Sequence, residues 1–295
     1  MRNLIDRATA EEIIRRKLPD TKKIIFIDHG YNNLIAEVDK KYIFRTPKTD
    51  AGLTLFKIEG KILNMLSKVS SIPIPSPVQS SVHPPYSVLT YLPGEHLENR
   101  EIRELGAAVQ KTIGKQLAEF VVDLNKQASV EEIKHIRSSL NKRGAEPWDS
   151  YFKKIFSIQQ KQSKLEELNQ KYYSLWKSIV PSQTIVIHDD LHPANLLFEG
   201  HSLSGVLDLE QVNTGTIEQE FRNLYRLSDA VLEAAANRYR ELTGKTIDIE
   251  AVKVWAITAE LAALSRQINK QDTNHTSYKR AEAKLRFWLG DAFPL

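Results

Sequence analysis

Residues 185–198 read IVIHDDLHPANLLF, and residues 205–211 read GVLDLEQ. Two apolar runs, at residues 184–187 and 195–198, predict short strands on either side of a polar loop. A third apolar run ends at Asp208. Carboxylates and a carboxamide are therefore expected at loop tips that buried strands support. Phosphoryl transfer needs this arrangement, in which one carboxylate orients a hydroxyl group while other oxygen atoms bind Mg²⁺.

Three residues carry the predicted chemistry. Asp190 would accept the proton of an attacking hydroxyl group and hold that group in line with a phosphoryl group. Asn195 and Asp208 would supply the hard oxygen ligands that Mg²⁺ prefers. Asp190 alone is better explained as a cap of a turn after a strand, and the alternatives for Asn195 and Asp208 are a β-turn residue after Pro193 and a strand-end cap. Their spacing, each near the end of an apolar run, favours catalysis.

Other polar residues of this segment leave alternatives open. His188 is expected to support the loop by hydrogen bonding and not to act as a base. His192 is either a loop histidine bonded through Nδ1 or a contact to substrate. Glu210 either helps to bind the metal or faces solvent.

The composition excludes several classes of protein. The 295 residues exceed a typical single domain, which predicts two lobes, and 41% hydrophobic with 26% charged residues is typical of globular proteins. The absence of cysteine excludes disulfides and thiolate chemistry and fits a cytoplasmic protein. Scattered basic residues with a net charge of +4 give no support for a nucleic-acid partner. The sequence predicts neither a membrane span nor a signal peptide.

The first 93 residues have a β-rich pattern. Thr9-Ala-Glu-Glu12 reads as a capping box that would begin a first helix, and apolar residues at helical spacing predict another helix between residues 55 and 69. Residues 72–85 contain five of the twelve prolines and are expected to be extended. Strands are predicted at residues 22–29, 32–39, 41–46 and 86–92.

Residues 94–295 have mainly helical patterns. The predicted helices are residues 101–126, 130–141, 147–180, 217–242, 247–269 and 277–289. The predicted fold class is therefore α+β, with a small β-rich N-terminal lobe over residues 1–93 and a larger, mainly helical lobe over residues 94–295. The Pro93-Gly94 segment is the predicted hinge.

Two features of the β-rich lobe are suited to a nucleotide. Gly30-Tyr-Asn-Asn33 joins two predicted strands, and Gly30 and Asn32 could cover phosphates; the alternative is an ordinary hairpin turn. Arg45 ends the third strand, where a cation can reach phosphate groups, and Glu59 on the next helix could hold it in place. The alternative is a surface arginine and a solvated glutamate.

The chain resembles the aminoglycoside phosphotransferase family, the small-molecule branch of the protein-kinase-like fold, which also includes choline, homoserine and methylthioribose kinases. The resemblance is carried by HDDLHPAN at residues 188–195 and GVLDLE at residues 205–210. Arg45-Thr-Pro47, Glu59 and the sequence LTYLPG at residues 89–94 support it. The order and spacing of these motifs cover nearly the whole chain.

The resemblance implies that ATP, or GTP in its place, binds between the lobes, with its base bonded to the backbone at Thr90, Tyr91 and Leu92. Arg45 stands where the family has a lysine on the third strand. An arginine can still clamp phosphates, although its guanidinium is larger and forked.

By the same resemblance, Asp190 is the catalytic aspartate, and Asn195 and Asp208 hold Mg²⁺. This sequence also departs from the family pattern at four positions, which bear on the subfamily and leave the three transfer residues intact. Asp189 stands where glycine is usual, Asn125 replaces a histidine, and Thr216 and Glu220 replace parts of a Gly-Asp-Pro and Asp-Leu pattern.

The expected activity is transfer of a γ-phosphoryl group to a hydroxyl group of a small cationic molecule, with an aminoglycoside antibiotic as the first choice. A cationic acceptor is expected because Glu218, Glu220 and Asp189 belong to an acidic stretch near the motif. The alternative is that these charges form a solvated helix face. The alternative functions are a metabolic kinase for choline, homoserine or a sugar, and a nucleotide-binding regulator without catalysis.

Overall fold

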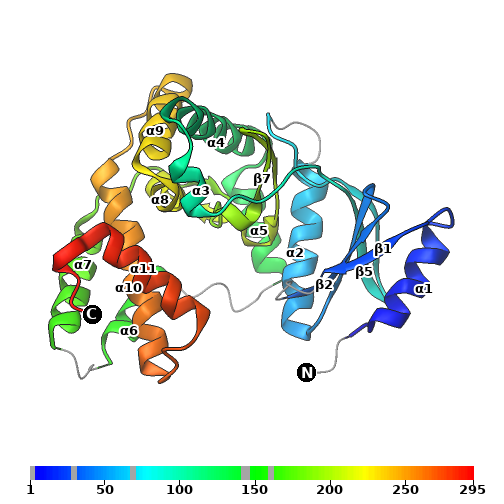
Figure 1. Cartoon of the computed structure of the whole chain (residues 1–295), viewed down its shortest axis with the longest axis horizontal. Coiled ribbons are helices and arrows are strands. Elements are labelled where there is room, and N and C mark those ends of the chain that lie inside the picture. The colour runs from blue at the N-terminus through cyan, green and yellow to red at the C-terminus, as the bar shows by residue number, and fades with distance from the viewer. Residues whose placement is uncertain (1–3, 28–31, 67–70, 141–146, 159–162) are drawn as a thin grey trace.

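The computed structural model describes residues 4–27, 32–66, 71–140, 147–158 and 163–295. An antiparallel sheet lies at one end of the molecule and a larger helical part at the other, with helix α2 (Asp50–Leu66) between them (Figure 1). The predicted α+β fold, with a β-rich N-terminal part and a helical C-terminal part, is confirmed. No helix in the described ranges is long and apolar enough to cross a membrane.

The sheet has five antiparallel strands in the order β1-β2-β3-β5-β4. The strand predicted at residues 86–92 and the three before it are confirmed within the described residues. One strand was missed, because the proline-rich stretch that was expected only to be extended pairs along the sheet edge as β4. The strands are β1 (Ile24–Ile27), β2 (Asn33–Val38), β3 (Tyr42–Pro47), β4 (Pro77–Val82) and β5 (Pro85–Thr90).

The two faces of this sheet are covered by different helices. Phe44 of β3 and Val88 of β5 lie opposite each other and pack in one cluster with residues of α1 (Arg7–Lys17). The next pair, Ile43 and Leu89, packs with α2 on the other face. Because side chains alternate along a strand, Arg45 points to the same face as Ile43, towards α2.

The capping box predicted at Thr9 is wrong. Helix α1 begins one turn earlier, and Asp6 is its N-cap, with the Asp6 side chain accepting a hydrogen bond of 2.8 Å from the Thr9 backbone N–H. Aspartate is as good an N-cap as serine or threonine, and the earlier start adds a further turn of helix.

Three long predicted helices are divided in the structure, and the one predicted over residues 147–180 ends its first piece at Phe156, with Ser157 as the C-cap. The helix predicted over residues 101–126 breaks at Leu105-Gly106, and the one over residues 217–242 breaks at Ser228, whose side chain caps the second piece by accepting from the Val231 N–H. The helices of this part are α3 (Asn99–Glu104), α4 (Ala107–Gln127), α5 (Val130–Leu140), α6 (Trp148–Phe156), α7 (Ser163–Ser178), α8 (Ile217–Leu227), α9 (Asp229–Thr243), α10 (Ile249–Asn269) and α11 (Thr276–Leu289).

Four short strands within the helical part carry the motif loops. β6 (Ile185–Ile187) pairs with β9 (Asn213–Gly215), and β7 (Leu196–Glu199) pairs with β8 (Ser202–Val206). The first three strands of the motif are confirmed where the sequence predicts them, whereas β9 was not predicted. The loop between β6 and β7 and the loop after β8 therefore begin and end on buried backbone.

The apolar core does not follow the division into sheet and helices. One buried cluster runs from Ile58 and Ile62 of α2 to Ile113 and Leu117 of α4 and on into β6, β7, α8 and α9. A second cluster, in α6, α7, α10 and α11, is aromatic: the Trp255 ring centroid lies 5.5 Å from that of Trp148 and 5.1 Å from that of Trp176.

Candidate active site

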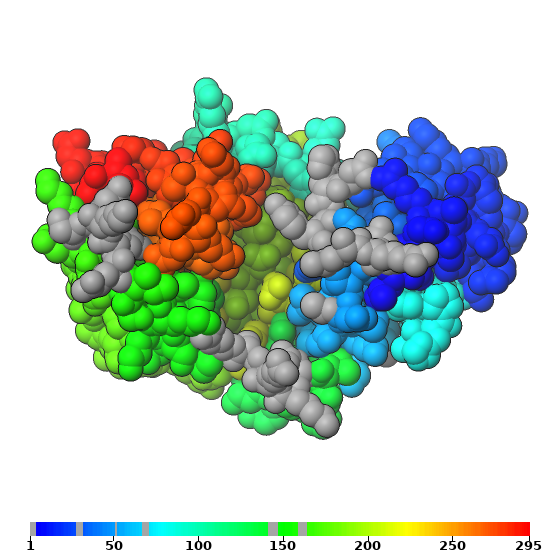
Figure 2. Space-filling model, turned by 90° about the horizontal axis from the view of Figure 1, so that it is seen from below, coloured from blue at the N-terminus to red at the C-terminus, as the bar shows by residue number. Residues whose placement is uncertain are grey.

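The two motif loops lie at a hollow between the sheet and the helical part. Seen from below, the hollow has olive and yellow atoms at its floor, the colours of the chain around residue 200, with blue atoms on one side and green and orange atoms on the other (Figure 2). We call residues 188–195 the catalytic loop and residues 208–211 the metal loop.

His188 fixes the catalytic loop from within. Its ring is fully buried, its Nε2 lies 3.0 Å from the Leu207 carbonyl oxygen, and its Nδ1 accepts from the Asp190 N–H at 3.3 Å. Burial lowers the pKa of His188, which favours a neutral ring. Both ring nitrogens are thus engaged with backbone, which fits loop support. Leu207 precedes Asp208, so the same ring also ties the two loops together.

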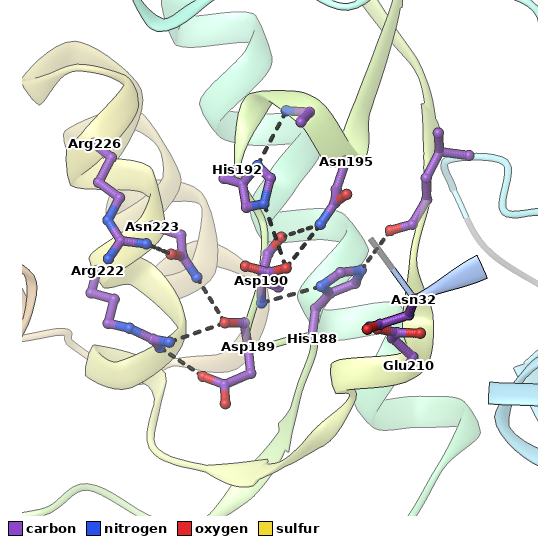
Figure 3. A network of polar contacts seen from close by, with 12 residues as sticks. Asn32, His188, Asp189, Asp190, His192, Asn195, Glu210, Arg222, Asn223 and Arg226 are labelled. Atoms are coloured by element: carbon purple, nitrogen blue, oxygen red, sulfur yellow. Dashed lines mark hydrogen bonds and ion pairs between the residues drawn. The ribbon is translucent and has the colours of Figure 1, made fainter. Parts of the chain in front are cut away.

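Asp190 is held by its neighbours and remains accessible. Asn195 Nδ2 donates to the Asp190 carbonyl at 2.9 Å and to its carboxylate Oδ2 at 3.2 Å, and His192 Nε2 lies 3.5 Å from the same Oδ2 (Figure 3). Burial raises the pKa of Asp190, but the hydrogen bond and charge of His192, together with the charges of His188 and Arg226, outweigh burial and bring the pKa below its ordinary value. An ionised carboxylate, 34% exposed, therefore faces the hollow.

His192 has its Nδ1 engaged with the loop backbone. The Ala194 N–H donates to this nitrogen at 3.2 Å. The alternative of an Nδ1-bonded loop histidine is therefore present in the structure, and the remaining ring nitrogen is the one that lies near Asp190.

Asp189 occupies a backbone position that favours glycine. Its φ of 67° is left-handed, a conformation that costs glycine nothing and that aspartate tolerates better than most residues. The Asp189 carboxylate points at Arg222 of α8 and away from the Asp190 carboxylate, with Nη1 and Oδ1 2.7 Å apart (Figure 3). Its charge is thus neutralised by a neighbour on the far side of the loop.

Glu218 and Glu220 are not brought to the hollow. They are 4% and 0% exposed, and each is bonded inside the protein. Glu218 accepts from the Ser182 hydroxyl at 2.6 Å, and Glu220 accepts from the Asp189 N–H at 2.7 Å. Burial raises the pKa of Glu220 to about 8. Their burial removes the premise that these carboxylates line an acidic cleft, and both have structural partners instead.

The metal loop leaves buried carboxylate oxygens without hydrogen bonds. Asp208 also has a left-handed φ, of 61°. Its Oδ1 and the Oε2 of Glu210 are buried and have no hydrogen-bond partner in the described part of the chain. The other Glu210 oxygen accepts from Asn32 Nδ2 at 2.6 Å, which joins the residue just before β2 to this loop. Burial, with the charges of Asp208 and Glu59, raises the pKa of Glu210 to about 7.

Arg45 and Glu59 form a buried ion pair beside the metal loop. Arg45 Nη1 lies 2.6 Å from Glu59 Oε1, and the two side chains are 11% and 4% exposed. Burial raises the pKa of Glu59; Arg45 lowers it and Asp208 raises it further. Glu59, Asp208 and Glu210 thus gather around one guanidinium, and a divalent cation would offset their excess negative charge.

No group of three His, Cys, Asp or Glu side chains with the geometry of a metal site occurs in the described residues. Mg²⁺ does not need one, because it usually binds one or two carboxylates and completes its octahedron with phosphate oxygens and water. The orphaned oxygens of Asp208 and Glu210 and the carboxamide of Asn195 fit such a partial ligand set.

The segment expected to bind the base is partly occupied by sheet hydrogen bonds. The Thr90 N–H donates to Ser76 and the Tyr91 N–H to Lys41, both at 2.9 Å, while the Leu92 N–H has no partner among the described residues. Gly30, the other residue expected at the nucleotide, lies outside the described residues.

After Pro93 the chain is fixed to the helical part. Gly94 has a φ of 126°, and a Cβ there would lie 2.4 Å from Ser204 Oγ and 3.0 Å from the Phe198 carbonyl oxygen. Glu95 then exchanges two backbone hydrogen bonds of 2.9 Å with Phe198. The hinge at Pro93-Gly94 stays a prediction.

Two residues that support the site were not predicted. Asn125 of α4 bonds both the N–H and the carbonyl of Val186 at 2.8 Å, which braces β6 below the catalytic loop. Arg137 of α5 donates to the carbonyls of Glu210 and Val212 at 2.7 Å. The sequence marks Asn125 as unusual, because it replaces a histidine of the family pattern. Nothing in the sequence marks Arg137.

The family model described as "Phosphotransferase enzyme family" matches residues 23–255. Among curated proteins, none matches the chain by sequence.

Solved structures share the fold at low sequence identity. The GDP complex of a wild-type aminoglycoside 2′-phosphotransferase has a TM-score of 0.78 at 16% identity, over 96% of this chain and 98% of that one. An aminoglycoside phosphotransferase in a ternary complex with streptomycin and ATP has a TM-score of 0.68 at 17% identity, over 95% and 96%. A macrolide 2′-phosphotransferase from Brachybacterium faecium has a TM-score of 0.66 at 16% identity, over 93% and 95%.

Proposed function

The chain belongs to the phosphotransferase enzyme family and is a small-molecule kinase, and from that premise we propose that it transfers the γ-phosphoryl group of ATP or GTP to a hydroxyl group. The observation that carries the proposal is the accessible, ionised Asp190, held 3.2 Å from Asn195 and tied through His188 to the backbone before Asp208. In this arrangement Asp190 accepts the hydroxyl proton and aligns the oxygen for attack on phosphorus.

Mg²⁺ would be held by Asn195 and Asp208, with Glu210 beside them. When bound, it supplies positive charge that neutralises the phosphate oxygens. The two buried carboxylate oxygens without hydrogen bonds support this assignment, since such groups are costly without a partner.

The nucleotide would lie between residues 1–93 and residues 94–295. Its base would bond the backbone at Thr90 to Leu92, where the N–H of Leu92 has no partner among the residues that the structure describes. Arg45, kept in place by Glu59, would contact the phosphates, and Gly30 and Asn32 would cover them. The bond from Asn32 to Glu210 supports this proposal, because it holds Asn32 beside the metal loop.

An aminoglycoside is the proposed acceptor, because similar folds are described in complexes with kanamycin and streptomycin. A macrolide is the second candidate, because macrolide phosphotransferases also share this fold. Glu218 and Glu220 are buried and do not make the hollow acidic, so an acceptor with less positive charge than an aminoglycoside also fits.

A screen for nucleotide consumption tests the proposal. Purified protein with Mg²⁺ and ATP or GTP is offered aminoglycosides, macrolides, amino alcohols such as choline and homoserine, and sugars, and phosphorylated product is identified by mass spectrometry. We expect a product 80 Da heavier than its acceptor, about the mass of one added phosphoryl group, and loss of that product in Asp190→Asn. Nucleotide binding without product for any acceptor would instead favour a non-catalytic regulator.

A further inference from the structure

Four side chains of α8 converge on Asp189, the residue before Asp190. Gln219 Nε2 donates to the Asp189 carboxylate at 3.0 Å, and Glu220 accepts from its N–H at 2.7 Å. Arg222 Nη2 and Asn223 Nδ2 donate to its carbonyl oxygen at 3.0 and 3.2 Å. One short stretch of helix thus binds the N–H, the carbonyl and the side chain of a single residue.

Arg222 makes the strongest of these contacts. Its Nη1 lies 2.7 Å from Asp189 Oδ1 while its Nη2 bonds the Asp189 carbonyl, so one guanidinium holds the side chain and the backbone of the same residue. The two side chains are only 6% and 16% exposed. Hydrogen bonds between ionised partners are stronger than neutral ones, and water competes little at a buried pair.

The other side of Arg222 rests on the aromatic cluster. Its guanidinium carbon lies 5.3 Å from the centre of the Trp148 ring and 5.8 Å from that of Trp255. Both distances are within the range of cation–π attraction. The position of Arg222, and through it the position of Asp189, is therefore set by the packing of α6 and α10.

These contacts act on the peptide unit that carries Asp190. The carbonyl that Arg222 and Asn223 hold belongs to the peptide bond between Asp189 and Asp190, and the N–H of that same bond donates to His188 Nδ1. A planar peptide fixed at both its oxygen and its nitrogen cannot rotate. Its plane determines the direction in which the Asp190 side chain leaves the backbone.

We propose that Asp189 and Arg222 form a positioning pair that sets the orientation of the Asp190 carboxylate. The proposal rests on the proposed function, because it takes Asp190 as the group that receives the hydroxyl proton. The pair touches neither nucleotide nor acceptor and acts only through Asp190. Loss of the pair should therefore lower kcat more than it changes the KM for nucleotide.

Arg222→Met tests the pair, because methionine keeps most of the length and apolar contact of the side chain but cannot hold Asp189. We expect kcat to fall by about tenfold to a hundredfold, with the nucleotide KM changed by no more than about threefold. Asp189→Asn, which keeps the shape but loses the charge, should lower kcat less. Arg238→Met is the matched control, since it breaks a 2.7 Å ion pair with Glu119 that joins α9 to α4.

The double variant Asp189→Gly with Arg222→Met separates positioning from general stability. Glycine adopts the left-handed φ without strain, and neither a buried guanidinium nor a carboxylate remains unpaired. If the pair acts as a unit, this variant should keep a higher kcat than the product of the effects of Arg222→Met and Asp189→Gly, each measured alone, gives. All rates are measured below the melting temperature of the least stable variant, so that every protein compared is folded.

Two results would overturn the proposal. One is that Arg222→Met and Arg238→Met have the same kcat while Asp190→Asn is inactive. This result would overturn the positioning pair but leave the proposed function intact. The other is a set of single and double effects that multiply without coupling. Wild-type protein that phosphorylates none of the acceptors, with Asp190→Asn indistinguishable from it, overturns the proposed function and this proposal together.

Discussion

The catalytic loop and the metal loop differ in how their polar groups are satisfied. In the catalytic loop, Asp190 has hydrogen-bonding partners on its side chain and its backbone, and Asp189 is bound at its N–H, its carbonyl and its Oδ1. In the metal loop, Asp208 and Glu210 each keep a buried oxygen without a hydrogen bond, within the described chain. The first loop is complete as it stands, whereas the second lacks positive charge.

This difference separates two requirements of phosphoryl transfer. The group that aligns the hydroxyl must be oriented before the acceptor arrives, so its neighbours are provided by the protein. In the proposed function, the carboxylates of the metal loop balance the positive charge of a metal ion that arrives with the nucleotide, so the protein leaves them without hydrogen bonds. Burial, and after it the charges of Asp208 and Glu59, raises the pKa of Glu210 to about 7, which is consistent with a site that lacks positive charge.

The largest expected effect concerns the completed loop. Asp190→Asn should lower kcat by at least about a hundredfold, because an amide cannot accept the hydroxyl proton. Nucleotide affinity should stay within about threefold of wild type, because Asp190 is assigned to the acceptor alone. Steady-state kinetics and nucleotide titration measure both quantities. Asp20→Asn, at an exposed position after α1, is the control. If Asp190→Asn kept more than a tenth of the wild-type kcat, Asp190 would not be the catalytic group.

A smaller effect is expected where the metal loop is incomplete. Asp208→Asn should raise the Mg²⁺ concentration for half-maximal rate by about tenfold, because a neutral amide replaces an anionic ligand. Asn195→Ala should do the same more weakly. Melting curves give a second measurement: Mg²⁺ with nucleotide should stabilise wild type more than Asp208→Asn. Identical Mg²⁺ titrations for wild type and both variants would exclude these residues from the metal site.

The brace beneath the catalytic loop gives a third test. Asn125→Ala leaves the N–H and carbonyl of Val186 without their side-chain partner. It should lower the free energy of unfolding by about 1–3 kcal/mol, the usual cost of a buried polar group left unpaired. Denaturant unfolding measures this. Thr112→Ala on the same helix, whose hydroxyl bonds only the Ala108 carbonyl, should have little effect; equal losses in both variants would argue against the brace.

The smallest effect concerns pH. The pKa of Glu220 rises from 4.5 to about 8 on folding because the carboxyl is buried, so between these values the folded protein holds a proton that the unfolded chain has released. The free energy of unfolding should then fall as pH rises across this window. Glu220→Gln cannot titrate and should show a weaker decline. Melting temperatures at pH 5, 6.5 and 8 compare them, and parallel curves would contradict a raised pKa for this group.

The residues assigned to transfer could be predicted because they stand close together in sequence. Asp190, Asn195 and Asp208 fall within one run of short strands and loops, and apolar patterns locate those strands. Their supports could not be predicted in this way. Arg222 and Asn125 reach the catalytic loop from helices distant in sequence, and no local pattern shows which side chains of a helix will face a loop.

The expectation of an acidic cleft failed at Glu218 and Glu220 for a related reason. A run of charges predicts a local potential only if the side chains reach solvent, and burial depends on packing that the sequence does not show. Asp189 likewise was expected to add negative charge beside Asp190, but its carboxylate pairs with Arg222. Long predicted helices are also divided at Gly106 and Ser228, which are N-caps of new helices. The apolar pattern continues across both positions and does not show these caps.

The apolar cluster that joins α2 to α4 has a consequence for synthesis on the ribosome. Ile58 and Ile62 emerge before the residues of α4 that cover them. The apolar face of α2 therefore stays uncovered until the chain has grown by another fifty or so residues. Exposed apolar surface at that stage favours aggregation. For the same reason, the N-terminal β-rich part of this protein is a poor module to transplant by gene fusion, because its core is completed only by chain that is made later.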